Sequence, residues 1–180
     1  MTTFGDNVVL DQPALVDASA VIYGKAYVGP GASIWSNVFI RSVKLEIRIG
    51  ARSNIQECVT IHAVSDKPTR IGKDTSITRN VTLQGCTIGD RCLIGNNATI
   101  LDGAKIGNNS IVAGNAIVVE GSEFPANSVI AGAPARCVKT RNNAEANLIF
   151  SRFYHATGRN KARGIKKLNK DELKRIMSGR

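Results

Sequence analysis

Few side chains in this chain are suited to acid–base or metal chemistry. It has two histidines, His62 and His155, and four cysteines among 180 residues. A zinc ion that activates water is commonly held by three imidazoles and keeps its fourth position for the water, so the supply of histidine limits this chemistry. The cysteines form no C-x-x-C pair, a pattern that favours buried, reduced thiols. They are Cys58, Cys86, Cys92 and Cys137.

The positive charge of the chain is concentrated towards its C-terminal end. Residues 141–180 carry eleven Lys or Arg and three acidic residues, a net of +8, whereas the first 140 residues carry only about +2. Such a segment is either a solvated helix face or an electrostatic arm for an acidic protein, anionic lipid or nucleic acid. The sequence shows no interleaving of aromatic and basic residues and no nucleic-acid-binding module, which disfavours a specific nucleic-acid partner.

Aliphatic residues recur at steps of six, and this period indicates the elements that position the side chains above. An α-helix does not present one face every six residues, and an ordinary strand alternates every two. A chain that turns a corner after each six residues places one such side chain on each flat side, as in a parallel β-solenoid. The seventeen positions are Val16, Ile22, Val28, Ile34, Ile40, Ile49, Ile55, Ile61, Ile71, Ile77, Leu83, Ile88, Ile94, Ile100, Ile106, Val112 and Val118.

The period also predicts the size of the solenoid. Three sides close one coil of about 18 residues, so seventeen positions make about five to six coils. Stacked at a strand spacing of roughly 4.8 Å, these coils form a prism about 25 Å tall. Longer steps at residues 40–49 and 61–71 predict loops on one face, where solenoids often bind their ligands.

The six-residue period stops near residue 140, and helical spacing follows. We therefore expect a β-helix over residues 1–140 and a basic helical tail over residues 141–180. No apolar stretch approaches the length of a membrane span, and the first ten residues lack the features of a signal or transit peptide. An intracellular protein, soluble or peripheral to a membrane, is expected.

Two helices are predicted within the tail. Apolar residues from Leu148 to Thr157 have helical spacing, so one apolar stripe should lie along the prism wall, with Gly158 ending the helix. A second, shorter helix should begin at Asn169, because Glu172 follows three residues later in the pattern of a capping box.

Several segments resemble the γ-class carbonic anhydrases. The most specific is the block Ile-Arg-Ile-Gly-Ala-Arg-Ser-Asn-Ile-Gln at residues 47–56. The ending Gly-Ala-Pro-Ala-Arg at residues 132–136 is shared with many hexapeptide acyltransferases. The resemblance covers roughly residues 10–140, and it implies a left-handed β-helix that trimerises, with metal sites at the three subunit interfaces. The other segments that carry it are residues 34–41, 59–62, 83–89, 93–95 and 100–104.

The zinc site that the resemblance implies is incomplete in this chain. The family's first histidine corresponds to His62, but its second falls on Arg79 and its third on Gln84. Arg stays protonated and cannot bind a metal. Near the site its charge would repel a divalent cation by several kcal/mol at an effective dielectric constant of about 20. Zinc is therefore expected to be absent or substoichiometric, and His62 to be a vestigial ligand.

The residues around this site also depart from the family. The family's Arg-Gly-Asp triplet at the interface reads Arg41-Ser42-Val43, so its carboxylate is missing. Gln56 matches a family glutamine near the substrate, and Glu57 stands where the family usually has Asp. The resemblance places Arg41, Val43 and Arg79 at the subunit interface. There Arg79 either pairs with Glu57 or Glu46 or forms an anion site.

These observations favour a noncatalytic γ-carbonic-anhydrase-like subunit with a role in assembly. The resemblance implies a homo- or heterotrimer of such chains. Metal-free relatives serve in the carbonic-anhydrase-like module of mitochondrial respiratory complex I, where the basic tail would suit docking. The expected location is then the matrix side of the inner membrane, and otherwise the cytoplasm. Two alternatives stay open: a CoA-dependent hexapeptide acyltransferase with His62 as general base, and a carbonic anhydrase that needs ligands from a partner chain.

Overall fold

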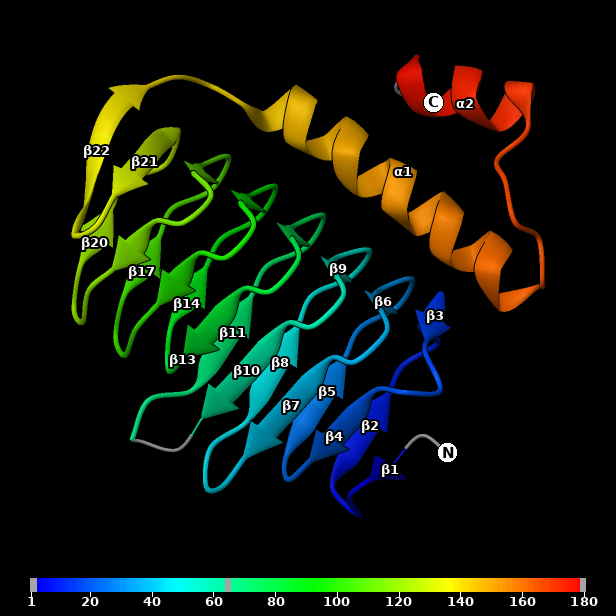
Figure 1. The fold of residues 1–180 in the computed structure, drawn as a ribbon, viewed down its shortest axis with the longest axis horizontal. Coiled ribbons are helices and arrows are strands. Elements are labelled where there is room, and N and C mark those ends of the chain that lie inside the picture. Colours follow the sequence, from blue (N-terminus) through cyan, green and yellow to red (C-terminus); the bar gives the residue numbers. More distant parts are fainter. Residues whose placement is uncertain (1–2, 64–65, 179–180) are drawn as a thin grey trace.

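The chain winds into a triangular prism of three parallel β-sheets, with one helix packed along it and a second, shorter helix packed on the first (Figure 1). The computed structural model describes residues 3–63 and 66–178. The chain passes through the three sheets in turn, so strands that are neighbours in a sheet belong to successive coils. The architecture is the hexapeptide-repeat, left-handed β-helix that the period and the resemblance predict.

The strands are short because each ends at a corner of the prism. Sheet A consists of β1 (Thr3–Phe4), β4 (Val21–Tyr23), β7 (Phe39–Ser42), β10 (Thr60–Ala63), β13 (Thr82–Gln84), β16 (Thr99–Ile100) and β19 (Ile117–Val118). Sheet B consists of β2 (Val8–Leu10), β5 (Ala26–Val28), β8 (Ile47–Ile49), β11 (Thr69–Ile71), β14 (Thr87–Ile88), β17 (Lys105–Ile106) and β20 (Glu123–Phe124). Sheet C consists of β3 (Leu15–Val16), β6 (Ser33–Ile34), β9 (Asn54–Ile55), β12 (Ser76–Ile77), β15 (Leu93–Ile94), β18 (Ile111–Val112), β21 (Ser128–Gly132) and an antiparallel final strand, β22 (Ala135–Thr140).

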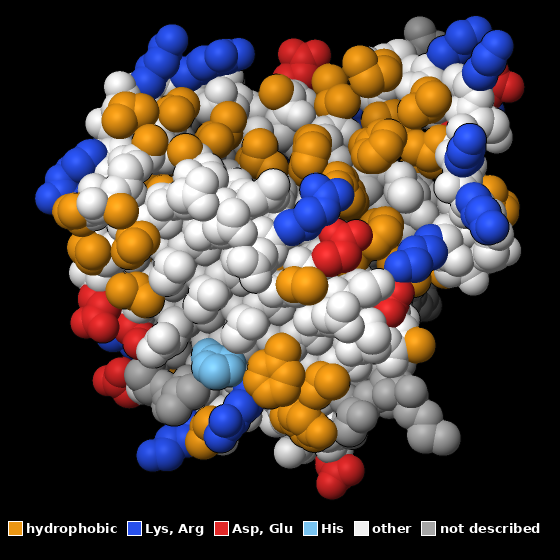
Figure 2. Space-filling model, viewed as in Figure 1, with side chains coloured by type: hydrophobic (Ala, Val, Ile, Leu, Met, Phe, Trp, Pro, Cys, Tyr) orange, Lys and Arg blue, Asp and Glu red, His pale blue; other side chains and the backbone are white. Residues whose placement is uncertain are grey.

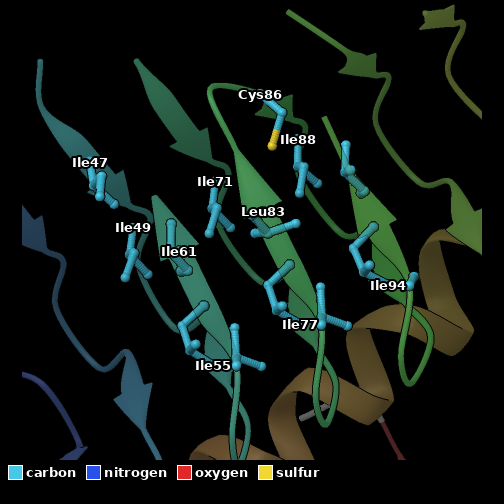
Figure 3. Close-up of a cluster of buried hydrophobic side chains, with 14 of the residues drawn as sticks. Ile47, Ile49, Ile55, Ile61, Ile71, Ile77, Leu83, Cys86, Ile88 and Ile94 are labelled. Atoms are coloured by element: carbon cyan, nitrogen blue, oxygen red, sulfur yellow. The ribbon is translucent and has the colours of Figure 1, made fainter. Parts of the chain in front are cut away.

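The core is a set of three stacks of aliphatic side chains inside the prism (Figure 3). Sixteen of the seventeen predicted positions are buried, and Val16 is half-buried. The predicted count of five to six coils is wrong, because each sheet contributes a parallel strand to seven coils. The step of six continues beyond the predicted positions, through Leu10 at one end and Phe124 and Ile130 at the other.

The corner from sheet A to sheet B carries the irregular steps. The chain bulges there between β7 and β8 and again between β10 and β11, as the period predicts; residues 64–65 of the second loop lie outside the described residues. In the later coils the same corner is made by Gly85, Gly103 and Gly121, whose φ angles of 51°, 72° and 66° are ones that glycine adopts without steric cost.

Helix α1 (Ala144–Ala162) runs from the last coils back towards the first, along sheet C (Figure 1). The prediction that Gly158 ends this helix is wrong, since α1 continues to Ala162. Gly158 is buried against the prism, and a Cβ atom placed on it would lie 3.2 Å from the Cβ of Ser33. The absence of a side chain therefore allows the helix to approach sheet C closely.

The predicted apolar stripe of α1 is right only in part. Phe150 and Tyr154 pack with Leu15 and Trp35 of the prism. Polar side chains of α1 make further contacts. Asn147 donates from Nδ2 to the backbone oxygens of Arg91, at 2.8 Å, and Ser110, at 3.2 Å. One turn later Ser151 Oγ donates to the Arg52 oxygen at 2.9 Å. These carbonyl groups lie where the chain turns from sheet B to sheet C, so the helix packs by pairing with backbone groups at the corners.

Helix α2 (Lys170–Met177) begins as predicted. The Asn169 side chain accepts hydrogen bonds from the backbone N–H groups of Asp171 and Glu172, and the Glu172 carboxylate accepts one from the Asn169 N–H. This reciprocal capping box satisfies backbone donors that a helix start leaves free. Neither helix, over the residues that the structure describes, is apolar enough to cross a membrane.

Candidate functional site

His62 lies on the outer face of sheet A, in one row with two other polar side chains. Ile61 points into the core, and successive side chains of a strand point to opposite faces, so His62 points outwards. The strand register places His62 beside Arg41 of β7 on one side and beside Gln84 of β13 on the other. We call Arg41, His62 and Gln84 the His62 row.

The His62 imidazole has an aromatic neighbour but no hydrogen-bond partner for its ring nitrogens within the described ranges. The Phe39 ring lies edge to face with it, at a centroid distance of 5.9 Å, and Tyr23 continues this aromatic contact. The imidazole is half-buried. Its two nitrogens thus stay available for hydrogen bonds.

Gln84 is oriented by a residue that the sequence reasoning missed. Its Nε2 atom donates a hydrogen bond of 2.7 Å to Asp102 Oδ2. Asp102 follows β16, one coil further along sheet A, and stands 18 residues after Gln84 in the sequence. The coil length of the solenoid was therefore the signal that could have identified it.

Arg79 lies at the opposite edge of sheet A from the His62 row, because it precedes β13 whereas Gln84 ends that strand. Its Nε atom is 3.2 Å from Glu57 Oε2, so Arg79 pairs with Glu57, one of the two partners that the sequence left open, within its own chain. Its Nη2 atom donates a hydrogen bond of 2.9 Å to the Tyr154 hydroxyl of α1. Arg79 therefore has partners within its own chain, and the sequence indicated no contact with Tyr154.

Gln56 lies close to Glu57 rather than close to His62. Its side chain is fully buried, and its Nε2 atom donates a hydrogen bond of 2.9 Å to Asn54 Oδ1. Its Oε1 atom is buried and has no hydrogen-bond partner within residues 3–63 and 66–178. Gln56, Glu57 and Arg79, at the corner between sheets C and A, form a second group that we call the Arg79 corner.

The predicted site residues therefore form two groups on one chain. The His62 row lies where the strands of sheet A end, together with Val43, which is 52% exposed beyond the end of β7. The Arg79 corner lies where those strands begin. The two groups can meet only if sheet A of one subunit faces the corner of another, which is the arrangement that the resemblance implies.

The donors in these two groups do not fit a zinc site. Together they offer one imidazole, two amides, two guanidinium groups and one carboxylate. The guanidinium groups are permanent cations that cannot bind a metal, and the carboxylate, that of Glu57, is already paired with Arg79. In the described part of a single chain, no three side chains among His, Cys, Asp and Glu are grouped closely enough to hold a metal ion. No step through zinc is therefore derived from this arrangement.

Two of the four cysteines are buried, as expected, and two are exposed. Cys86 and Cys92 are buried, and burial raises the pKa of their thiols to about 12 and about 11. Because the thiolate is the reactive form, these two are inert. Cys58 and Cys137 are exposed, so the expectation of four buried thiols is wrong for them; all four are free.

Comparisons with known proteins show what the chain is similar to. The bacterial transferase hexapeptide family (six repeats) matches residues 68–102 and 85–119. Gamma carbonic anhydrase 1 of Arabidopsis thaliana, a mitochondrial protein, is 32% identical over 57% of this chain and 39% of its own length. A candidate carbonic anhydrase of Methanocaldococcus jannaschii is 43% identical over 45% of this chain and 51% of its own length. The matched part of the chain thus spans about half or less of these relatives.

Among solved structures, a candidate acetyltransferase from Bacillus cereus superposes with a TM-score of 0.77 at 27% identity, covering 89% of this chain and 91% of that one. The similarity to γ-class carbonic anhydrases that residues 47–56 and the neighbouring segments indicate is confirmed. The fold is shared more widely, with hexapeptide transferases.

Proposed function

We propose that this chain is a γ-carbonic-anhydrase-like subunit that has lost zinc-dependent hydration of carbon dioxide and serves in assembly of a trimer. The observation that carries the proposal is the position of Arg79. It occupies the place of a family histidine, and its guanidinium is tied to Glu57 and to Tyr154 of α1. A group that would bind zinc in the relatives is replaced here by one that joins the prism to its helix.

The outer face of sheet A supports a role in assembly. Besides the ring of Phe39, this face exposes Tyr23 at 42%, Ile117 at 41% and Val119 at 38%. Apolar side chains on a flat sheet face are stabilised when a partner covers them. The partner that we propose is another γ-carbonic-anhydrase-like chain, in a homotrimer or a mixed trimer.

A membrane-associated complex of the respiratory type is the larger assembly that we propose for such a trimer. The support is the similarity to a mitochondrial relative and the net charge of +8 on residues 141–180, which suits an acidic partner. The location on the matrix side of the inner membrane belongs to this same proposal.

The zinc site can be tested by rebuilding it. In Arg79→His/Gln84→His, three imidazoles converge if the Arg79 corner of one subunit faces the His62 row of the next. We expect the original protein to hold far less than one zinc per subunit and to show no hydration of carbon dioxide above buffer. The double variant should bind zinc near stoichiometry, measured by elemental analysis, and should gain thermal stability because zinc binds only the native trimer.

The matched control is Arg79→Gln. It loses the contacts with Glu57 and Tyr154 as the double variant does, but supplies no imidazole, so it should take up no zinc. The double variant is still expected to hydrate carbon dioxide slowly. Val43 and Glu57 differ from the family's residues around the metal, and such residues tune a metal-bound water. Stoichiometric zinc and activity in the original protein would overturn the proposal, and would favour a carbonic anhydrase with an unusual or partner-completed site.

A CoA-dependent acyltransferase is the second candidate, favoured by the superposition on the Bacillus cereus protein and by the unpartnered imidazole of His62. In this reading His62 is the general base that deprotonates the acceptor. Calorimetry with CoA separates the two candidates. If the original protein binds CoA and transfers acetyl groups, and His62→Gln loses the transfer, the acyltransferase function is favoured over the assembly role. If the original protein does not bind CoA, the acyltransferase function is excluded.

A further inference from the structure

A hollow lined by arginines lies between α1 and α2, and its lining includes no residue of the His62 row or the Arg79 corner. Its volume is about 290 Å³. Four arginines and one glutamate line it, a net charge of +3 with histidine neutral, and the end of the molecule that carries α2 is rich in Lys and Arg (Figure 2). The lining residues are Arg52, Arg152, His155, Ala156, Arg159, Glu172, Arg175 and Ile176.

Two of the charged groups around this hollow are already paired within the chain. Arg52 makes a bidentate contact with Asp74, with both N–O distances at 2.7 Å. The Glu172 carboxylate is held by the Asn169 N–H at 2.9 Å and by Asn160 Nδ2 at 3.2 Å. Glu172 therefore secures the start of α2, and it is the only acidic residue in the lining of the hollow.

The other three arginines make no such close contacts, although the Glu172 carboxylate attracts Arg159 and Arg175 electrostatically. Over residues 3–63 and 66–178, no ion pair or side-chain hydrogen bond involves the guanidinium of Arg152, Arg159 or Arg175. Guanidinium groups cannot lose their charge at any ordinary pH. Three of them around one hollow repel one another, and an anion between them would remove this repulsion.

The floor of the hollow is apolar, and the His155 side chain in its lining is held by a hydrogen bond. Ala156 of α1 and Ile176 of α2 are 8% and 7% exposed. His155 is held in place because its Nδ1–H donates to the Gly31 backbone oxygen at 2.8 Å. The hollow thus combines an apolar base with a cationic rim, which is how pockets for small organic anions are built.

We infer that the hollow between α1 and α2 binds a small phosphomonoester, with its phosphate at Arg152, Arg159 and Arg175 and its carbon portion over Ala156 and Ile176. Planar guanidinium groups match phosphate oxygens in pairs. A dianion compensates three unpaired cations better than a single carboxylate does. The volume is near the lower end of the range of about 300–1,000 Å³ for small-molecule pockets, which limits the ligand to one ring or a short chain beside the phosphate.

The experiment uses the full chain with phenyl phosphate and inorganic phosphate as probes. Calorimetry at constant ionic strength measures the affinity for each probe. We expect phenyl phosphate to bind more tightly than inorganic phosphate, because only it covers the apolar floor. Arg159→Gln/Arg175→Gln should weaken both by about tenfold or more, the loss expected when charge-assisted hydrogen bonds to phosphate are removed. Ile176→Ala should weaken phenyl phosphate alone.

The matched control is Lys166→Gln/Lys167→Gln, which removes the same charge from exposed positions beyond the end of α1. It should leave the affinity within about twofold, since exposed charges at a distance are screened by salt. An equal loss in both double variants would show general attraction to a basic surface and would overturn the inference. So would the absence of binding at millimolar phenyl phosphate in the original protein.

A lipid headgroup could present the same phosphomonoester. Vesicles that contain phosphatidic acid test this source, with vesicles of a phosphodiester lipid at matched surface charge as the comparison. Preference for phosphatidic acid that is lost in Arg159→Gln/Arg175→Gln supports the site with a lipid as its ligand. Equal binding to both kinds of vesicle, without binding of phenyl phosphate, contradicts it.

Discussion

Asp17 and Lys161 fasten the end of α1 to the first coil. Lys161 Nζ lies 2.7 Å from Asp17 Oδ2 and 5.1 Å from the centre of the Trp35 ring. The hydrogen bond from Lys161 is the main cause that holds the pKa of the Asp17 carboxyl well below its usual value, and bonds from Ser19 add to it against the opposing effect of burial.

Asp17→Asn should therefore destabilise the protein in a pH-dependent way. A carboxyl whose pKa is lowered by folding contributes stability above its unfolded pKa of about 3.9, and loses it as the pH falls towards the folded pKa. The variant should be less stable by roughly 0.5–1 kcal/mol at pH 7, the range of a partly exposed ion pair, and the difference should shrink below about pH 4. Urea unfolding at several pH values measures it.

The pair Lys105–Glu123 provides the control for this prediction. Its N–O distance is also 2.7 Å, but its side chains are 62% and 65% exposed. Glu123→Gln should change stability by much less than Asp17→Asn, since exposed pairs contribute little. An effect of Asp17→Asn that does not vary with pH would mean that shape, and not charge, fastens the end of the helix.

At the scale of the elements, α1 is the one whose packing the sequence misrepresents. Hydropathy favours a buried stripe of Leu148, Ile149, Phe150, Phe153, Tyr154 and Thr157. Tyr154 is buried as predicted, but Phe153 is 39% exposed and Asn147 is 2% exposed. Asn147 and Ser151 lie against the prism because they donate hydrogen bonds to corner carbonyls. The positions of those carbonyls are not visible in an amphipathic pattern.

Asn147→Leu tests this reading, because hydropathy alone would favour the change. We expect a loss of about 1–3 kcal/mol, since the Arg91 and Ser110 oxygens at the buried interface lose the donor from Asn147. The neighbouring exposed variant Ala146→Leu should stay within about 0.5 kcal/mol of the original protein. Thermal or urea unfolding measures both. Equal stability of Asn147→Leu and the original protein would show that α1 packs by apolar contact after all.

The solenoid itself could be predicted because one rule acts at every rung. A side chain that points into a narrow prism must be aliphatic, so the step of six is visible in the sequence at Ile22 as at Val112. Phe124 departs from this rule, since it is aromatic and only half-buried, although Leu10 and Ile130 keep the step of six. The capping box at Asn169 could be predicted for a similar reason, because its partners lie within three residues.

The candidate site was predictable only in part. Resemblance identified His62, Arg79 and Gln84, and the charge of Arg79 suggested its pairing with Glu57. Asp102 and Tyr154 were missed because they join the site across 18 and 75 residues of sequence. The coil length of 18 residues could have indicated Asp102, whereas the contact with Tyr154 depends on the path of α1, which a local pattern does not specify.

For the whole molecule, the division of the site into two groups indicates that subunits associate, and the resemblance to the γ-class carbonic anhydrases predicts a trimer. Light scattering at micromolar concentration should give three subunits. Ile117→Lys, which places a charge on the outer face of sheet A, should shift the protein towards monomer, whereas Val138→Lys, on β22 at 63% exposure, should not. A monomeric original protein would contradict the prediction. Arg79 does not itself favour a trimer, since its partners Glu57 and Tyr154 lie within the same chain.

The backward path of α1 has a consequence for how the molecule comes apart. In a stack of repeats each coil contacts only the next, so the ends of such a stack tend to fray independently. Here one helix is attached near the late coils through Asn147 and to the first coil through Lys161. Neither end can loosen without straining the same helix. The stack of coils should therefore unfold as a single cooperative unit. Helix α1 stabilises both ends, as capping repeats do in other solenoids.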